Sequence, residues 1–222
     1  PLQIFKDKVK ILPNAINEKN FILQQGDEVE IENIKKKYSN KKIVFFVGRH
    51  IQYKGLPYLL EAEKFIKSDC EIIIAGDGPL TGKLKSTCHS SRVHFIGRLD
   101  DNELRWYHYA ASIFAFPSIT KNEAFGIALA EAMYCGTPAV TFTIPGSGVN
   151  WVSLNNITGL EVSNKDCKAY AGAIDKLLID DRLREQFARK SIERVKEHFT
   201  IPIMIHLLDS YYKNMFENIY SK

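Results

Sequence analysis

Short apolar runs alternate with amphipathic stretches along most of the chain. Lys42–Val47 is a run of β-branched and aromatic residues that ends at a glycine, which is the pattern of a buried strand. From Leu56 to Ile66 the apolar residues recur every three or four positions, which predicts a helix packed against such a strand. The two patterns repeat, and the predicted strands are Lys42–Val47, Glu71–Ala75, Arg92–Ile96, Ser112–Phe116, Ala139–Phe142 and Gly159–Val162. The predicted helices are Leu56–Ile66, Leu80–Cys88, Asp101–Ala110 and Phe125–Cys135, and helices dominate from Asp166 onward.

This alternation at short spacing predicts an α/β fold: a Rossmann-like open parallel sheet with helices on both faces. Ligands of such sheets bind at the carboxyl ends of the strands, so the turns after the strands are the places to look for chemistry. Those turns are Gly48–Gly55, Gly76–Pro79, Gly97–Asp100, Pro117–Gly126 and Phe142–Gly148. Residues 1–20 are a poorly periodic lead-in, and we find no internal repeat and no linker rich in Pro, Gly or Ser.

Composition excludes several other classes of protein. Apolar residues make up 45% and charged residues 25% of 222 residues, which is ordinary for a globular domain with a sizeable core. No apolar run approaches the ~18–20 residues of a membrane span, and the first residues do not resemble a signal peptide. A net charge of +4 without a block of like charges does not predict a nucleic-acid partner. We therefore expect a cytoplasmic protein.

Neither cysteine nor histidine spacing predicts a metal site. The four cysteines are scattered and form no C-x-x-C pair, and the six histidines show no H-E-x-x-H or similar spacing. The cysteines are Cys70, Cys88, Cys135 and Cys167. We expect reduced thiols and no bound metal.

The turn after the first strand carries two cations. Arg49 and Lys54 lie five residues apart, between Gly48 and Gly55. A planar guanidinium together with a mobile ammonium suits a diphosphate. The alternative is a solvated loop, and on the turn alone the two interpretations are equal. His50 is interpreted as incidental.

The turn after the second strand reads Gly76-Asp77-Gly78-Pro79. A strand followed by G-x-G invites comparison with the dinucleotide fingerprint, but Thr81 stands where the third glycine belongs. An NAD-dependent oxidoreductase is therefore disfavoured. A tight turn at Gly78 that lets a ligand approach the backbone remains consistent with the pattern.

The segment from Pro117 to Gly136 is the most informative. Glu123 precedes the predicted helix start at Phe125-Gly126-Ile127, where free N–H groups favour an anion. Glu131 lies inside that apolar helix and needs a partner or a ligand if it is buried. Two carboxylates at this place can accept hydrogen bonds from sugar hydroxyls. The alternative is that Glu123 only stabilises the helix start and Glu131 is a surface residue.

Five motifs in order carry a resemblance. They are V-G-R-x4-K-G, A-G-D-G-P, F-I-G-R-L, P-S-x4-E-A-F-G and the A-E-A-M-x-C-G-T-P-A-V run that follows. Together they resemble the nucleotide-sugar domain of the retaining GT-B glycosyltransferases of family 4, over residues ~40–200. Ile11–Asn17 is also similar to the interdomain lead-in of that family, with Ala15 where glycine is usual.

The resemblance implies a role for each site residue. Arg49, Lys54 and Glu123 are the implied catalytic residues: the two cations neutralise the donor diphosphate and Glu123 holds hydroxyls of the donor sugar. Glu131 accepts hydrogen bonds from the ribose. The other implied donor-binding positions are backbone groups at Gly48, Gly78, Arg98, Leu99, Phe125, Gly126 and Ile127, of which Arg98 and Leu99 contact the base.

The implied protein is one half of a GT-B enzyme. Residues 1–20 are the interdomain lead-in, residues 21–200 the C-terminal donor-binding domain, and residues 201–222 a helix that crosses to an N-terminal domain absent from the chain. We expect the isolated fragment to be inactive. The apolar residues of that last helix are expected to be exposed or to pack on a neighbouring chain. One departure from the family is the lack of a glutamate in Ser147–Trp151, which leaves the details of this loop open.

The implied reaction is sugar transfer, with retention, from a nucleotide-diphosphate sugar to a saccharide or a lipid-linked saccharide. It belongs to bacterial surface polysaccharide synthesis, such as O-antigen or capsule. We expect a UDP-sugar rather than a GDP-sugar, no metal cofactor, and peripheral contact with the inner face of the cell membrane. Two alternatives stay open: a non-catalytic nucleotide-sugar-binding module and a GT-B-fold UDP-sugar epimerase. We further expect that Lys54→Ala lowers transfer far more than it lowers folding stability.

Overall fold

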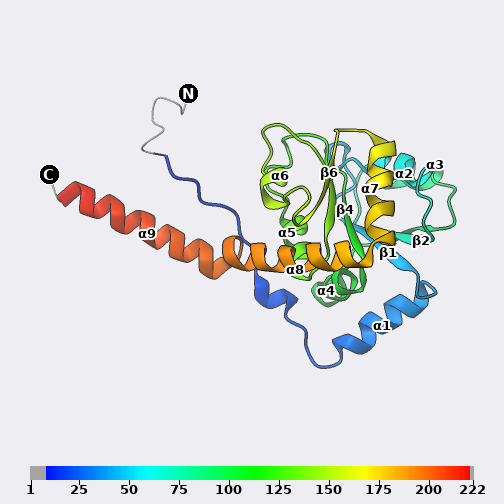
Figure 1. The fold of residues 1–222 in the computed structure, drawn as a ribbon, viewed down its shortest axis with the longest axis horizontal. Coiled ribbons are helices and arrows are strands. Elements are labelled where there is room, and N and C mark those ends of the chain that lie inside the picture. Colours follow the sequence, from blue (N-terminus) through cyan, green and yellow to red (C-terminus); the bar gives the residue numbers. More distant parts are fainter. Residues whose placement is uncertain (1–8, 221–222) are drawn as a thin grey trace.

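The computed structural model describes residues 9–220, with side chains described to residue 216. The strands are β1 (Lys42–Val47), β2 (Cys70–Ala75), β3 (Val93–Gly97), β4 (Ile113–Phe116), β5 (Ala139–Phe142) and β6 (Gly159–Val162). The helices are α1 (Asp27–Lys37), α2 (Leu56–Glu63), α3 (Thr81–Thr87), α4 (Asp101–Ala110), α5 (Ile127–Tyr134), α6 (Val149–Val152), α7 (Cys167–Ile179), α8 (Asp181–His198) and α9 (Ile201–Tyr220). Two short 3-10 helices, η2 (Glu18–Phe21) and η3 (Gln52–Lys54), complete the described elements (Figure 1).

The six strands form one open sheet in the order β3-β2-β1-β4-β5-β6, and every neighbouring pair is parallel. This confirms the predicted Rossmann-like α/β fold. The chain first builds outward from β1 to β3 and then returns to build from β4 to β6 on the other side. The order therefore reverses between β1 and β4, which is where ligands of open parallel sheets bind.

The sheet is covered on both faces. Ile43, Val44, Phe45 and Phe46 of β1 have no exposed surface, as expected for a strand of a parallel sheet buried on both sides. Helices α2 and α7 pack together, with α7 lying on β4, β5 and β6. Helices α4 and α5 pack against each other, with α1 and α8 outside them. The core thus has two layers of helix around one layer of sheet.

Some predicted boundaries shift in the structure. Helix α5 begins at Ile127 rather than Phe125, because Gly126 adopts a left-handed conformation (φ 88°) and starts the helix. Helix α2 ends at Glu63 rather than Ile66, since Phe65 N–H and Ile66 N–H donate to carbonyls three residues back in tighter turns. Helices α1 and α6 were not among the predicted elements. The helical region after Asp166 is divided into α7, α8 and α9.

The segment before η2 meets the junction of α8 and α9 beside the sheet. Ile16 is buried, its N–H donates to the Phe199 carbonyl (2.8 Å), and its carbonyl accepts from Ile201 N–H (3.2 Å). Helix α9 begins at this junction and runs away from the body (Figure 1). No helix in residues 9–220 combines the length and the apolar character needed to cross a bilayer.

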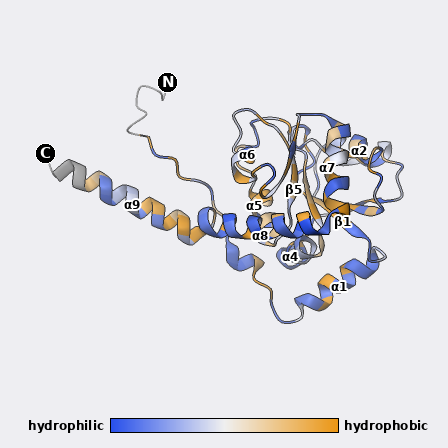
Figure 2. Cartoon of the chain, in the orientation of Figure 1, coloured by the Kyte–Doolittle hydropathy of each residue, from blue (hydrophilic) through white to orange (hydrophobic). Residues whose placement is uncertain are grey.

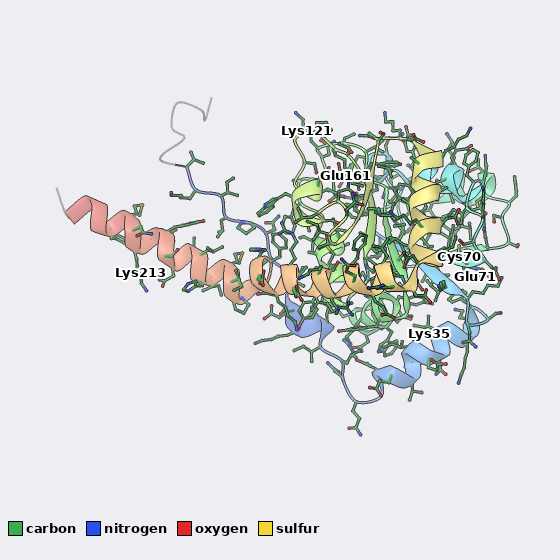
Figure 3. All side chains as sticks on the ribbon, viewed as in Figure 1. Lys35, Cys70, Glu71, Lys121, Glu161 and Lys213 are labelled. Atoms are coloured by element: carbon green, nitrogen blue, oxygen red, sulfur yellow. The ribbon has the colours of Figure 1, made fainter. Side chains whose placement is uncertain are left out.

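Apolar side chains remain exposed along α9. Ile205, Leu208, Tyr212 and Met215 are 38–55% exposed and recur at helical spacing. Figure 2 shows these hydrophobic stretches on the part of α9 that projects from the body. Lys213, on the same helix, pairs with Asp209 (2.7 Å) and points away from the body (Figure 3). The predicted exposure of apolar residues on this helix is therefore confirmed for its described side chains.

Candidate active site

The turns that follow β1, β2 and β3 are joined at the carboxyl edge of the sheet. Gly48 N–H donates to the Ala75 carbonyl (3.3 Å), and Gly76 N–H donates to the Gly97 carbonyl (2.6 Å). Gly76 has φ +108°, and a Cβ atom there would lie 2.0 Å from the Gly48 carbonyl oxygen. Only glycine fits such a contact, so the turns approach closely enough to form one continuous surface.

A cavity of about 580 Å³ opens on this surface. It brings together five of the predicted donor-site residues, Gly48, Arg49, Gly78, Arg98 and Leu99, beside Asp77, Pro79 and Leu104. Arg49 is exposed, and its side chain makes no hydrogen bond or ion pair within the described part of the chain. An unpaired guanidinium at the mouth of a strand is available to an anionic ligand.

Lys54 and Glu123 are bound to each other. Lys54, at the end of η3, places its Nζ atom 2.5 Å from Oε2 of Glu123, which lies in the loop between β4 and α5. Their side chains are only 14% and 9% exposed. Ser118 also donates to Oε2 (3.0 Å), and the Lys54 ammonium lies 5.4 Å from the Phe116 ring centre. The loop thus holds a nearly buried ion pair.

Glu131 behaves differently from Glu123. It lies on α5 among buried apolar residues, and burial raises its pKa to about 7, with the Asp101 carboxylate adding to the rise. Glu131 has no hydrogen-bond or ion-pair partner in the described part of the chain. A half-buried carboxyl group without a partner needs hydrogen-bond donors from elsewhere. This is what the sequence predicted for Glu131 if it is buried.

The start of α5 presents backbone N–H groups to the same edge. Gly126 is its N-cap, and no side chain accepts a hydrogen bond there. Ile127, the first helical residue, is 48% exposed. The N–H groups of this first turn lack intrahelical partners, so they favour an anion. Gly126 and Ile127 thus begin a helix with free backbone N–H groups after the carboxyl end of β4.

Phe125 lies apart from the first cavity. Its ring is buried and meets Phe199 edge to face, with the ring centres 5.3 Å apart. It lines a second cavity of about 670 Å³ together with Ile11–Asn14, Trp151 and Tyr211. Its side chain therefore packs toward the lead-in and α9, and only its backbone remains at the donor edge.

The loop that lacks the family glutamate is held by other residues. Ser147–Trp151 includes the start of the short helix α6, which was not predicted. Asn150 accepts from Ile144 N–H (2.8 Å) and donates to the Phe142 carbonyl (3.0 Å), and Ser147 donates to the Glu123 carbonyl. Lys121, in the neighbouring loop after β4, points outward at the edge of the molecule (Figure 3). Asn150 thus holds this loop to the end of β5, and Ser147 ties it to the loop that carries Glu123.

Two residues were missed by sequence reasoning. His50, interpreted as incidental, is only 1% exposed, and its Nδ1 atom lies 2.8 Å from the Thr81 hydroxyl. Thr81, noted only as a missing glycine, also binds the Asp77 carboxylate. Nothing in the sequence separates a buried loop histidine from an exposed one. Among residues 9–220, no three His, Cys, Asp or Glu side chains gather closely enough to hold a metal ion.

The model of the family described as glycosyl transferases group 1 matches residues 27–194, which include all of the sheet and both carboxylates of the site. The chain belongs to this family. Among group 1 relatives, it is 26% identical to O-antigen chain mannosyltransferase C of Escherichia coli, over 95% of this chain and 55% of the relative. It is 32% identical to the D-rhamnosyltransferase WbpZ of Pseudomonas aeruginosa, over 72% of this chain and 42% of the relative. The chain spans about half the length of the curated relatives it matches.

Solved structures show the same fold. Sucrose-phosphate synthase from Thermosynechococcus elongatus superposes with a TM-score of 0.80 at 25% identity, over 98% of this chain and 56% of that one. HepE of Anabaena, solved in complex with UDP and glucose, superposes with a TM-score of 0.79 at 18% identity, over 92% of this chain and 56% of that one. The group 1 chain thus has the sheet and helix arrangement of these proteins.

Proposed function

We propose that this chain is the donor-binding, C-terminal half of a retaining GT-B glycosyltransferase of family 4. The full-length enzyme transfers a hexose or N-acetylhexosamine from a nucleotide-diphosphate sugar, of the UDP type, to a saccharide or lipid-linked saccharide. The pathway is bacterial surface polysaccharide synthesis. The names of the O-antigen mannosyltransferase and D-rhamnosyltransferase relatives support that pathway, and the UDP complex of HepE supports the nucleotide.

One observation supports the proposal most: the charged and polar groups along the carboxyl edge of the sheet suit the base, ribose, diphosphate and sugar of a nucleotide sugar. The cavity beside Arg98 and Leu99 takes the base. Glu131, which has no partner in the described part of the chain, accepts from the ribose hydroxyls. Arg49 and the start of α5 face the diphosphate, and the Lys54–Glu123 pair lies where diphosphate and sugar meet.

The proposed chemistry uses these groups without a metal. The bond between the anomeric carbon and the diphosphate breaks, a bond to an acceptor hydroxyl oxygen forms, and the proton of that hydroxyl passes to the departing diphosphate, through an oxocarbenium-like transition state. Negative charge grows on the departing diphosphate, which Arg49, Lys54 and the N–H groups at Gly126 and Ile127 stabilise in place. Glu123, paired with Lys54, accepts hydrogen bonds from hydroxyls of the donor sugar.

The rest of the enzyme is proposed to lie outside this chain. The lead-in (1–20) and the helix (201–222) then join the donor domain (21–200) to an N-terminal domain that binds the acceptor. The exposed apolar face of α9, formed by Ile205, Leu208, Tyr212 and Met215, packs on that domain. The full-length enzyme works in the cytoplasm at the inner face of the cell membrane, where lipid-linked acceptors are found.

Product analysis of the full-length protein tests this function. Incubation with a panel of UDP- and GDP-sugars and a saccharide acceptor should give a new glycoside with the anomeric configuration of the donor. Binding of donor without any product would favour the non-catalytic module. A donor returned with an altered sugar would favour the epimerase, and an inverted product would contradict retention.

A further inference from the structure

A small polar network lies beneath the donor cavity. The Thr81 hydroxyl donates to Oδ1 of Asp77 (2.8 Å) and accepts from Gly78 N–H (2.9 Å). The Nδ1 atom of His50 lies 2.8 Å from the same hydroxyl oxygen. A hydroxyl has one proton, which Asp77 receives, so His50 must be the donor in the third contact.

The network fixes the protonation of His50. Burial lowers its pKa, so the ring is neutral near pH 7, and its proton is assigned to Nδ1 by the hydrogen bond to Thr81. The ring is held between Phe46 and Phe95, with ring centres 6.3 and 6.1 Å away. Its Nε2 atom lies 3.4 Å from the Ala75 carbonyl oxygen, and in this tautomer it has no proton to donate there. The side chain therefore has one strong polar contact, and that contact is to Thr81.

The backbone of His50 is tied to the same turn. Its N–H donates to the Asp77 carbonyl (3.0 Å), and its carbonyl accepts from Leu80 N–H (3.0 Å). A Cβ atom on Gly78 would lie 2.7 Å from the His50 carbonyl oxygen, so the two chains are in direct contact. The Gly76–Pro79 turn is therefore bound to His50 on both its backbone and its side chain.

Residues beside both His50 and Thr81 line the donor cavity. Arg49 directly precedes His50, and Asp77, Gly78 and Pro79 form the opposite wall. The Arg49 side chain has no hydrogen bond or ion pair within residues 9–220 that would set its position. Its backbone position therefore depends on the anchored residue next to it.

We propose that His50 is a positioning residue for donor binding: its hydrogen bond to Thr81 locks the Gly76–Pro79 turn against the loop that carries Arg49. The inference rests on the proposed function, since it concerns the same nucleotide-sugar site. His50 does not touch the ligand. It keeps the two walls of the cavity at the spacing that the nucleotide needs, so that binding does not have to order them.

Four variants of the full chain test this role. His50→Leu and Thr81→Val each remove the hydrogen bond, and the double variant removes both partners. His50→Asn keeps an amide N–H near the position of Nδ1. Two exposed residues provide matched controls. Thr87→Val changes the last residue of α3, the helix that begins at Thr81, and His89→Leu changes a histidine just after it. Dissociation constants for UDP and GDP are measured by calorimetry, together with thermal unfolding of the unliganded chain.

His50→Leu and Thr81→Val should each raise the dissociation constant for UDP and GDP by about three- to tenfold, which corresponds to the free energy of one hydrogen bond. The double variant should be no weaker than the weaker single variant, because both remove the same contact. His50→Asn should recover most of the affinity, and the controls should bind like the wild type. In the full-length enzyme the losses should appear in the KM for donor rather than in kcat.

Other results would overturn the inference without touching the function. Wild-type affinity in His50→Leu and Thr81→Val, or additive losses in the double variant, would show that the contact does not position the site. If His50→Leu fails to fold, the comparison of Thr81→Ser with Thr81→Val decides, since only serine keeps the hydroxyl, and equal affinities would contradict the role. Failure of the wild type to bind any nucleotide would instead contradict the proposed function.

Discussion

The Nζ atom of Lys54 lies 2.5 Å from Oε2 of Glu123, and less than a sixth of either side chain is exposed. The two residues are 69 positions apart and come from opposite sides of the point where the strand order reverses. The proposed phosphate cation and the proposed sugar acceptor are therefore one electrostatic unit. Removal of either leaves the other charged in a poorly solvated place.

This pairing changes what is expected of a Lys54 variant. Lys54→Met should lower the unfolding free energy by about 2–4 kcal/mol at neutral pH, because Glu123 then lacks its counter-charge. It should also lower transfer by the full-length enzyme about 10²–10³-fold, because a preorganised donor to the diphosphate is lost. Urea unfolding and initial rates measure the two effects. The ion pair thus adds a stability loss to the loss of transfer expected from the sequence.

The control is the double variant Lys54→Met with Glu123→Gln. Since neither charge remains, most of the lost stability should return while transfer stays absent. A double variant as unstable as Lys54→Met would show that the pair does not couple the two residues.

The carboxyl group of Glu131 should make the stability of the fold depend on pH. Its pKa of about 7 lies above its unfolded value of 4.5, so the unfolded state loses its proton first as pH rises, and the fold is destabilised between those values. Glu131→Gln should therefore raise the unfolding free energy by roughly 1–3 kcal/mol at pH 8 and leave it unchanged at pH 4. The same substitution should weaken nucleotide binding about tenfold, since the carboxylate accepts more strongly than an amide.

A matched substitution separates this effect from a general loss of acidic charge. Glu32→Gln, on the exposed side of α1, should change neither the stability profile nor the affinity. Equal profiles for Glu131→Gln and the wild type would mean that Glu131 is not buried as the structure places it.

His108 should make the fold sensitive to acid. It is fully buried among Phe21, Phe45 and Phe114, neither ring nitrogen has a partner, and burial lowers its pKa to about 3. Below pH 6.5 the His108 ring takes up a proton in the unfolded state but not in the folded state. The free energy of unfolding therefore falls as pH drops toward 3. His108→Phe should be more stable by about 1–2 kcal/mol at pH 8, and by about 2 kcal/mol more at pH 5.

The difference between variant and wild type cancels the other titrating groups. His89→Leu, at an exposed histidine, should follow the wild type at both pH values. A constant difference between His108→Phe and the wild type from pH 8 to pH 5 would refute the burial of a neutral histidine.

The strands were predictable from the chain because a parallel sheet buries both of its faces. Runs such as Ile43–Phe46 then stand out without any alternation. Helix α1 was missed because its ends are crowded with charge, yet Ile31, Ile34 and Tyr38 are buried at spacings of three and four, a signal that was present. Helix α6 has four residues, too few for any period to show.

The sequence could predict which residues belong to the candidate site, but not which of them are in contact. Because Glu131 lies inside an apolar run, the sequence already predicted that its carboxylate would need hydrogen-bond donors if buried. The contact between Lys54 and Glu123 could not be foreseen, since it depends on how two loops meet after the sheet forms. The burial of His50 could not be foreseen for the same reason, because it comes from Phe46 and Phe95 on two different strands.

The central claim is that the carboxyl edge of this sheet binds a nucleoside diphosphate through Arg49, Lys54 and Glu131. Calorimetric titration of the chain with UDP, GDP and ADP, and with the matching monophosphates, tests it most directly. The account predicts binding of UDP that exceeds binding of UMP and that falls about tenfold or more in Arg49→Ala. Binding of none of these nucleotides, or equal affinity of wild type and Arg49→Ala for UDP, would contradict it.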